Sequence, residues 1–244
     1  MDRPDASRLP PVARTLTVRV WRGAEAGEFR TYDVPRQASQ TVLDVVTHIQ
    51  RNIDPTLSYR FACRVGMCGS CGVVINGRER WACRTLLKSL KTRIVTVRPL
   101  YHFPLIRDLV VDLAPLAEQA ARVGAAFVPK EEPAAFAQVG ADALERQRID
   151  PAIECIGCGM CVSACTMVAN DERFPGPAAL NRLFTVDTDS RDAGHADRAA
   201  VLVAEDTLMR CHTQANCTDV CPMEISPTES ILALRRRAVR GLLG

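Results

Sequence analysis

A chain of 244 residues is long enough for one or two domains with hydrophobic cores. Its 47% hydrophobic and 24% charged residues are typical of a globular protein, and a net charge of +3 indicates no large surface for nucleic acid. No run of about eighteen uncharged apolar residues is present to span a bilayer. Residues 1–14 lack the apolar core of a secretory signal, so we expect a reducing compartment.

The first part of the chain has the alternating apolar pattern of strands, interrupted by one segment with helical spacing. Asn76-Gly77 is a strong two-residue turn signal between two short strands. A small mixed sheet around a cysteine loop predicts a β-grasp, plant-type ferredoxin domain over residues 14–105, after a flexible N-terminus at 1–13. The predicted elements are strands at 14–23, 28–34, 73–75, 79–81 and 92–98, and a helix at 41–53.

A connecting region follows the sheet domain, and from about residue 140 onward the strand pattern disappears. Residues 106–140 are expected to form a connecting helix at 108–123 and a proline-containing linker. Residues 141–244 predict an all-α domain of the bacterial-ferredoxin type, which makes the fold class α+β. Ser226-Pro227-Thr228-Glu229 is a capping box that begins the final helix. Its arginines, Arg235–Arg237 and Arg240, are expected to form a solvated face or to meet a partner.

Eleven cysteines lie in three tight groups, whose spacings match iron–sulfur ligation. Their number is odd and their spacings are too short for a set of unstrained disulfides, which favours metal ligation. The first group is plant-type and the other two resemble bacterial ferredoxins. The groups are Cys63, Cys68, Cys71 and Cys83; Cys155, Cys158, Cys161 and Cys165; and Cys211, Cys217 and Cys221.

The first group satisfies the ligand requirement of a [2Fe–2S] cluster by itself. Three of its thiolates lie in one compact loop, and Cys83 arrives from a following segment. Small residues between them let the backbone approach the sulfides, where N–H groups stabilise negative charge. These residues are Gly66, Gly69, Ser70 and Gly72. We call this set of four cysteines the first centre.

In two-cluster ferredoxins the fourth cysteine of each run ligates the other cluster. This rule assigns Cys155, Cys158, Cys161 and Cys221 to a [4Fe–4S] cluster, the second centre. It leaves Cys165, Cys211 and Cys217 for the third centre. Position 214, where a fourth cysteine would fall, is Gln214. Three thiolates suit a [3Fe–4S] cluster, and the assignment uses all eleven cysteines.

Two alternatives remain open from the cysteine pattern. The C-x2-C pairs also occur in zinc ribbons, although zinc sites use two pairs separated by a loop. Gln214 or a solvent oxygen also serves as a possible fourth ligand, which would make the third centre [4Fe–4S]. The sequence contains no nucleophile–base pair, phosphate loop or nicotinamide fingerprint. We therefore expect electron transfer and no catalytic bond chemistry in this chain alone.

The sequence resembles the iron–sulfur subunit of the succinate dehydrogenase and fumarate reductase family over nearly its whole length. Besides the cysteine groups, the resemblance rests on residues 57–60 (Leu-Ser-Tyr-Arg), 68–72 (Cys-Gly-Ser-Cys-Gly), 107–112 (Arg-Asp-Leu-Val-Val-Asp), 176–179 (Gly-Pro-Ala-Ala) and 189–192 (Asp-Ser-Arg-Asp).

The resemblance implies a relay of electrons in the order [2Fe–2S], [4Fe–4S], [3Fe–4S]. It implies two partners, which are an FAD-containing flavoprotein subunit that interconverts succinate and fumarate and an integral membrane anchor that carries quinone. The chain would then lie at the cytoplasmic face of the bacterial plasma membrane, held there by the anchor. The alternative is the iron–sulfur subunit of another flavoprotein system, of the glycolate, glycerol-phosphate or heterodisulfide type.

The chain departs from the family pattern beside the third centre. Succinate dehydrogenases typically follow the residue at Cys165 with proline and a tryptophan pair, but here the segment is Thr166-Met167-Val168-Ala169-Asn170. Gln214 stands where the family usually has an apolar residue, whereas His212 matches a histidine near the quinone. The candidates for the quinone side are therefore His212, Asn170 and Gln214.

Overall fold

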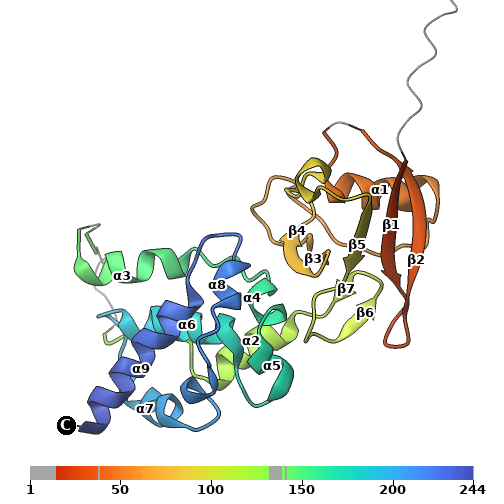
Figure 1. The fold of residues 1–244 in the computed structure, drawn as a ribbon. Coiled ribbons are helices and arrows are strands. Elements are labelled where there is room, and N and C mark those ends of the chain that lie inside the picture. The colour runs from red at the N-terminus through yellow and green to blue at the C-terminus, as the bar shows by residue number, and fades with distance from the viewer. Residues whose placement is uncertain (1–14, 38, 132–138, 141, 244) are drawn as a thin grey trace, which may run out of the picture.

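The computed structural model describes residues 15–37, 39–131, 139–140 and 142–243. Two lobes lie side by side in Figure 1, one built on a sheet and the other helical. The expected flexible N-terminus at 1–13 and part of the expected linker lie outside the described residues. Among the described residues, no helix is long and apolar enough to cross a membrane.

The sheet lobe contains a five-stranded mixed sheet in the order β2-β1-β5-β3-β4. Strand β1 pairs antiparallel with β2 and parallel with β5, and β3 pairs antiparallel with β5 and β4. The helix α1 covers one face. The bounds are β1 Thr15–Arg22, β2 Glu28–Pro35, α1 Val42–Asn52, β3 Gly72–Ile75, β4 Arg78–Trp81, the 3-10 turn η1 Leu87–Leu90, and β5 Ile94–Arg98.

Local sequence signals explain these elements. Leu16, Val18 and Val20 alternate along β1 and are almost completely buried. Helix α1 begins with a capping box, in which the Asp44 N–H donates to the Thr41 hydroxyl at 3.2 Å. At the β3–β4 turn, Asn76-Gly77 adopts the positive φ values of 51° and 79° that a tight hairpin needs.

The expected helix at 108–123 begins later than the sequence indicated. The structure places β6 (Leu105–Arg107) and β7 (Val110–Val111) in a small hairpin, and α2 spans only Ala114–Arg122. Asp108 lies at the turn with φ +52°. Its buried carboxylate accepts hydrogen bonds from Arg22 Nε at 3.1 Å, Gly23 N at 2.7 Å and Ser58 N at 2.8 Å. These bonds to distant residues hold the backbone out of a helix.

The helical lobe is organised around α6, which packs against α2, α3 and α9. Leu180 and Leu183 of α6 are fully buried with Ile231 and Leu234 of α9. The bounds are α3 Leu144–Ile153, α4 Met160–Ser163, α5 Thr166–Asn170, α6 Gly176–Thr188, α7 His195–Val203, η2 Leu208–Arg210, α8 Asn216–Asp219 and α9 Pro227–Leu243. As predicted, α9 begins at Pro227, and the Glu229 N–H donates to Ser226 Oγ at 3.3 Å.

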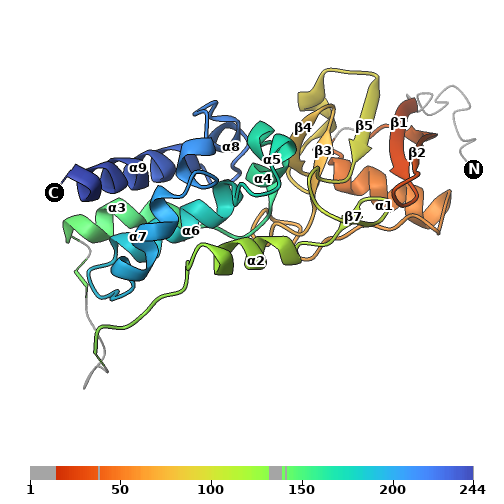
Figure 2. The same ribbon diagram turned by 90° about the horizontal axis from the view of Figure 1, so that it is seen from below.

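The two lobes meet through a packed apolar junction rather than a free linker. Val74 of β3 shares one buried cluster with Phe103, Met160 and Val162. Figure 2 shows α4 and α5 at this junction and the end of α9 far from the sheet. Because α4 lies among the cysteine groups of the helical lobe, the junction brings those groups next to the sheet lobe.

Candidate metal centres

The first centre is built on the loop before β3 and the turn after β4. The N–H groups of Met67 and Cys68 donate to Cys63 Sγ at 3.2 and 3.3 Å, and the N–H of Val65 does so at 3.5 Å. The loop therefore wraps its backbone donors around a sulfur atom, as a thiolate ligand requires.

The four thiols of the first centre divide into an accessible pair and a buried pair. Hydrogen bonds from the Cys63 backbone and from Ser70 lower the pKa of the Cys68 thiol to about 6. Burial, together with the neighbouring Cys83, raises the pKa of the Cys71 thiol to about 12. All four are free cysteines, and Cys71 and Cys83 are the buried ones.

The second centre surrounds a small, largely apolar cavity between the turn before α4 and the start of α9. Burial and the charges of Cys155 and Cys221 raise the pKa of the Cys158 thiol to about 11. Burial raises the pKa of Cys161 still further, and all three other cysteines of the set contribute. The structure thus brings Cys221 to the cavity across more than fifty residues of sequence, as the cross-ligation rule predicts. The cavity-lining cysteines are Cys155, Cys158, Cys161 and Cys221.

The third centre joins the residue before α5, Cys165, to Cys211 at the end of η2 and Cys217 in α8. Burial, with the nearby Cys217 and Cys211, raises the pKa of the Cys165 thiol, and this is opposed by the N–H groups of Val168 and Met167. Burial also raises the pKa of the Cys217 thiol. Cys165 therefore lies near Cys211 and Cys217, the two cysteines with which the spacing groups it.

The chemistry of these three sets of thiols is the chemistry that iron–sulfur clusters require of their ligands. Buried thiols that sit together resist ionisation, because each thiolate is desolvated and repels the next. A cationic cluster core removes both penalties and ionises the ligands. Among the described residues, no three Cys, His, Asp or Glu side chains converge as the ligands of a single ion would.

The side chains proposed for the quinone side lie together on an exposed surface next to the third centre. Thr166 Oγ1 donates to Gln214 Oε1 at 2.6 Å, and Asn170 Nδ2 donates to the carbonyl oxygen of Thr166 at 2.6 Å. All three residues are exposed, as is His212. The Gln214 oxygen is therefore already engaged by Thr166. Thr213 and Ala215, on either side of Gln214, have φ values of +58° and +62°.

Arg235 has a role that sequence reasoning missed. It was expected on a solvated or partner-facing surface, but its side chain is half-buried against the third centre. Arg235 Nε donates to the carbonyl oxygen of Leu208 at 2.8 Å, and the guanidinium also donates to the carbonyl oxygen of Cys211. A helical spacing cannot show that a loop twenty-four residues upstream will fold back onto the helix. Arg237 likewise pairs with buried Asp187 at 2.6 Å.

Known protein families match both cysteine-bearing lobes. Residues 16–118 match the 2Fe-2S iron-sulfur cluster binding domain, and residues 151–225 match the 4Fe-4S dicluster domain. The fumarate reductase iron-sulfur subunit of Mycobacterium tuberculosis is 38% identical over 84% of each chain. The succinate dehydrogenase iron-sulfur subunit of Paracoccus denitrificans is 36% identical, over 81% of this chain and 76% of its own length. The chain belongs to the iron–sulfur subunits of the fumarate reductase and succinate dehydrogenase family.

A solved structure agrees with this family membership. A chain of the Mycobacterium smegmatis Sdh1 complex in the apo form has a TM-score of 0.85 and 30% identity, over 96% of this chain and 99% of that chain. The resemblance drawn from the sequence is confirmed, and the zinc alternative loses its support. As a member of the family, this iron–sulfur subunit is an electron-transfer component of an oxidoreductase complex, with 2Fe-2S and 4Fe-4S domains.

Proposed function

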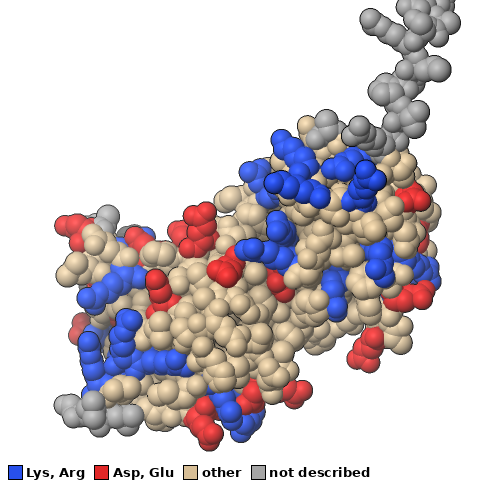
Figure 3. Space-filling model, in the orientation of Figure 1, with Lys and Arg blue, Asp and Glu red and all other residues tan. Residues whose placement is uncertain are grey.

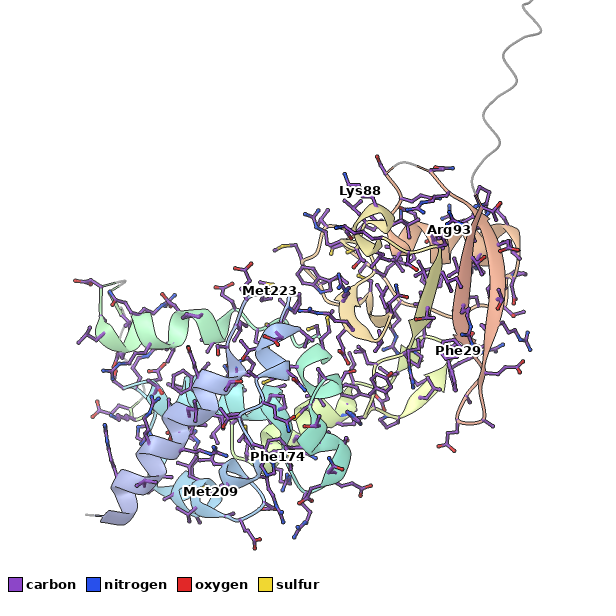
Figure 4. The ribbon with its side chains drawn as sticks, viewed as in Figure 1. Phe29, Lys88, Arg93, Phe174, Met209 and Met223 are labelled. Carbon is purple, nitrogen blue, oxygen red and sulfur yellow. The ribbon has the colours of Figure 1, made fainter. Side chains whose placement is uncertain are left out.

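We propose that this subunit carries electrons through its three centres in chain order, from a flavoprotein to quinone. The observation that carries the proposal is the spatial order of the cysteine sets. The first-centre loop contacts the second centre at Cys158, and Cys161 of the second centre lies near Cys217 of the third. In Figure 4, Met209 lies at the outer edge of the helical lobe and Met223 near the junction. The segment between them carries Cys211, Cys217 and Cys221.

The cofactors and ligands follow from the same arrangement. The proposed ligands are Cys63, Cys68, Cys71 and Cys83 for [2Fe–2S]; Cys155, Cys158, Cys161 and Cys221 for [4Fe–4S]; and Cys165, Cys211 and Cys217 for [3Fe–4S]. When bound, these clusters supply one-electron chemistry whose potentials depend on hydrogen bonds and solvent exposure. The chain itself would hold the thiolates, donate N–H groups to them and surround the second centre with a largely apolar lining. We interpret the sheet lobe as a β-grasp module and the helical lobe as a bacterial-ferredoxin-like module.

The two ends of the relay are suited to different partners. On the first-centre loop, Phe61, Val65 and Met67 are exposed by 38%, 60% and 63%, which favours an apolar contact with a succinate- and fumarate-converting flavoprotein. On the quinone side of the relay, the face in Figure 3 has few charged side chains where α5, which begins next to Cys165, lies in Figure 1. We assign that surface, with Asn170, His212 and Gln214, to the quinone-bearing anchor at the cytoplasmic face of the bacterial plasma membrane.

Replacing Cys68 with alanine tests the order of the relay. Loss of one of the four thiolates is expected to remove the [2Fe–2S] signal from the EPR spectrum of the complex. Electrons then have no entry to the second centre, so quinone reduction by succinate should fall to background. Succinate oxidation by an artificial dye that takes electrons at the flavin should persist.

The serine variant at the same position is the matched control. Cys68→Ser replaces the sulfur ligand with an oxygen ligand and keeps nearly the same side-chain size. Partial recovery of both the cluster signal and quinone reduction is expected. Normal quinone reduction in a Cys68→Ala complex that lacks the [2Fe–2S] signal would show that electrons bypass the first centre.

A further inference from the structure

The backbone of the first-centre loop touches a ligand residue of the second centre. A Cβ atom placed on Gly69 would lie only 2.7 Å from the Cβ of Cys158 and 3.2 Å from its Cα. Real Cβ atoms do not approach this closely, so no side chain larger than hydrogen fits here. Gly69 also has a φ of +71°, which side chains rarely adopt. Gly69 therefore lies where the two cysteine loops are in contact.

A buried polar contact fixes the lobes beside this point. Ser163 Oγ donates to Glu79 Oε1 at 2.7 Å and accepts the Tyr101 N–H at 2.9 Å. Glu79 of β4 is 7% exposed and Ser163 of α4 is 3% exposed. Because an unpaired polar group in such a site is costly, the bond restricts how the lobes slide or separate. Ser163 lies two residues after Cys161, so the restriction acts on the second centre.

Other contacts across the junction support one fixed arrangement. Arg78 Nη2 donates to the carbonyl oxygen of Asp219 at 2.7 Å, on the helix between Cys217 and Cys221. Within the part of the chain that the structure describes, Glu79 has no ion-pair partner. Its bond to Ser163 is therefore the specific polar link that this carboxylate makes across the lobes.

We propose that Gly69 and the Glu79–Ser163 hydrogen bond act together as a spacer that sets the distance between the first and second centres. Gly69 allows the loops to reach contact, and the buried bond keeps them there. Both are positioning residues, since neither supplies a ligand. The inference rests on the proposed relay, in which one electron leaves the reduced first centre and enters the oxidised second centre, with no bond made or broken. Electron tunnelling weakens steeply with distance, so a small separation of the lobes slows this step.

The first test is a Gly69→Ala variant of the whole complex. The added methyl group must push Cys158 and its loop away, because the nearest atoms belong to a ligand residue and its backbone. With both centres reduced, the EPR splitting that arises from their magnetic interaction is expected to shrink or vanish. The integrated intensity of each signal should stay near one spin per centre, which shows that both clusters are still present.

Gly66→Ala is the matched control for strain within the loop. Gly66 has a φ of +80°, and a Cβ there would meet Arg84 and Trp81 of its own lobe at 2.9 Å. The control therefore strains the same loop against residues of its own lobe and not against Cys158, although Trp81 also borders the apolar junction. We expect it to retain the magnetic splitting. Equal splitting in wild type and Gly69→Ala, or equal loss in both glycine variants, would overturn the spacer role of Gly69.

A series at position 79 tests the hydrogen bond without changing a cysteine loop. Glu79→Gln keeps an oxygen acceptor for Ser163, so the splitting should be preserved. Glu79→Leu fills similar space but removes the acceptor, so the splitting should decrease. A decrease of the same size in both variants would attribute the effect to the lost charge and refute the bond as part of the spacer.

The outcome of these tests is separable from the proposed function. If the spacer proposal is wrong but the relay is right, the Gly69→Ala and Glu79→Leu complexes keep the wild-type magnetic splitting and the wild-type rate of quinone reduction. The Cys68→Ala variant still abolishes quinone reduction in that case. If the relay is wrong, Cys68→Ala leaves quinone reduction intact whatever the splitting shows.

Discussion

At the scale of single residues, the third centre is defined by the side chain at position 214. Gln214 occurs where a fourth cysteine would complete the run, and its side-chain oxygen accepts a hydrogen bond from Thr166 at 2.6 Å. That bond orients the amide at an exposed surface. A polar group beside a cluster is expected to raise its reduction potential by hydrogen bonding to sulfur.

A Gln214→Cys variant should convert the third centre towards [4Fe–4S]. The fourth thiolate supplies the missing ligand and adds negative charge, so the reduction potential of the centre should fall. EPR of the oxidised complex is expected to lose the three-iron signal. Gln214→Val is the control that lacks both a thiolate and the Thr166 bond, and it should keep three irons. The oxidised three-iron signal at full intensity in Gln214→Cys would contradict the assignment.

The residue scale also shows which parts of the site the sequence could predict. The crossed ligand sets that we propose were predicted from spacing, because each cluster needs several thiolates from compact loops and the chain offers few ways to supply them. Arg235, Glu79 and Ser163 could not be identified in this way. Their roles depend on contacts across 24 and 84 residues of sequence, and nothing in their local pattern distinguishes them from ordinary surface or core positions.

At the scale of elements, the sequence predicted the turns and helix starts that depend on adjacent residues. It did not predict the element boundaries that depend on long-range contacts. The β3–β4 hairpin and the start of α9 depend on a few adjacent residues, Asn76-Gly77 and Ser226-Pro227, and both were predicted correctly. Helix α2 begins later than predicted because Asp108 is bound to Arg22 and Ser58. The segment that follows α2 is likewise held by a distant residue, since the Val128 N–H donates to Asp192 Oδ2 at 2.9 Å.

The buried Asp192–Arg198 pair is expected to stabilise the link between α2 and α7. Arg198 Nη1 donates to Asp192 Oδ1 at 2.6 Å, and its guanidinium also binds the carbonyl oxygens of Gly124 and Ala126. Asp192→Asn leaves a buried guanidinium without its counter-ion. We expect a loss of about 3 kcal/mol in the free energy of unfolding, typical of a broken buried ion pair.

Thermal unfolding of the cluster-loaded protein measures this loss as a lower midpoint. Asp150→Asn is the matched control, because Asp150 pairs with Arg146 at a half-exposed position on α3. Such surface pairs contribute little, so the midpoint should stay near that of the wild type. Equal midpoints for Asp192→Asn and the wild type would show that the buried pair does not stabilise the lobe.

At the scale of the whole molecule, the two lobes form one electron path rather than two independent modules. Their apolar junction, with Val74, Phe103 and Met160 in one cluster, holds the first centre against the second. The third centre lies next to the second, since Cys217 lies near Cys161. Contact between neighbouring centres is what the relay that we propose, from a flavoprotein to quinone, requires.

The central claim is that this chain holds three different clusters, of which the last has three irons. The most direct measurement is an EPR redox titration of the purified complex with its iron content. We predict about nine irons per chain and three distinct signals, among them a three-iron signal in the oxidised state. About ten irons with no oxidised three-iron signal, or a zinc-loaded chain without visible absorption, would contradict the account.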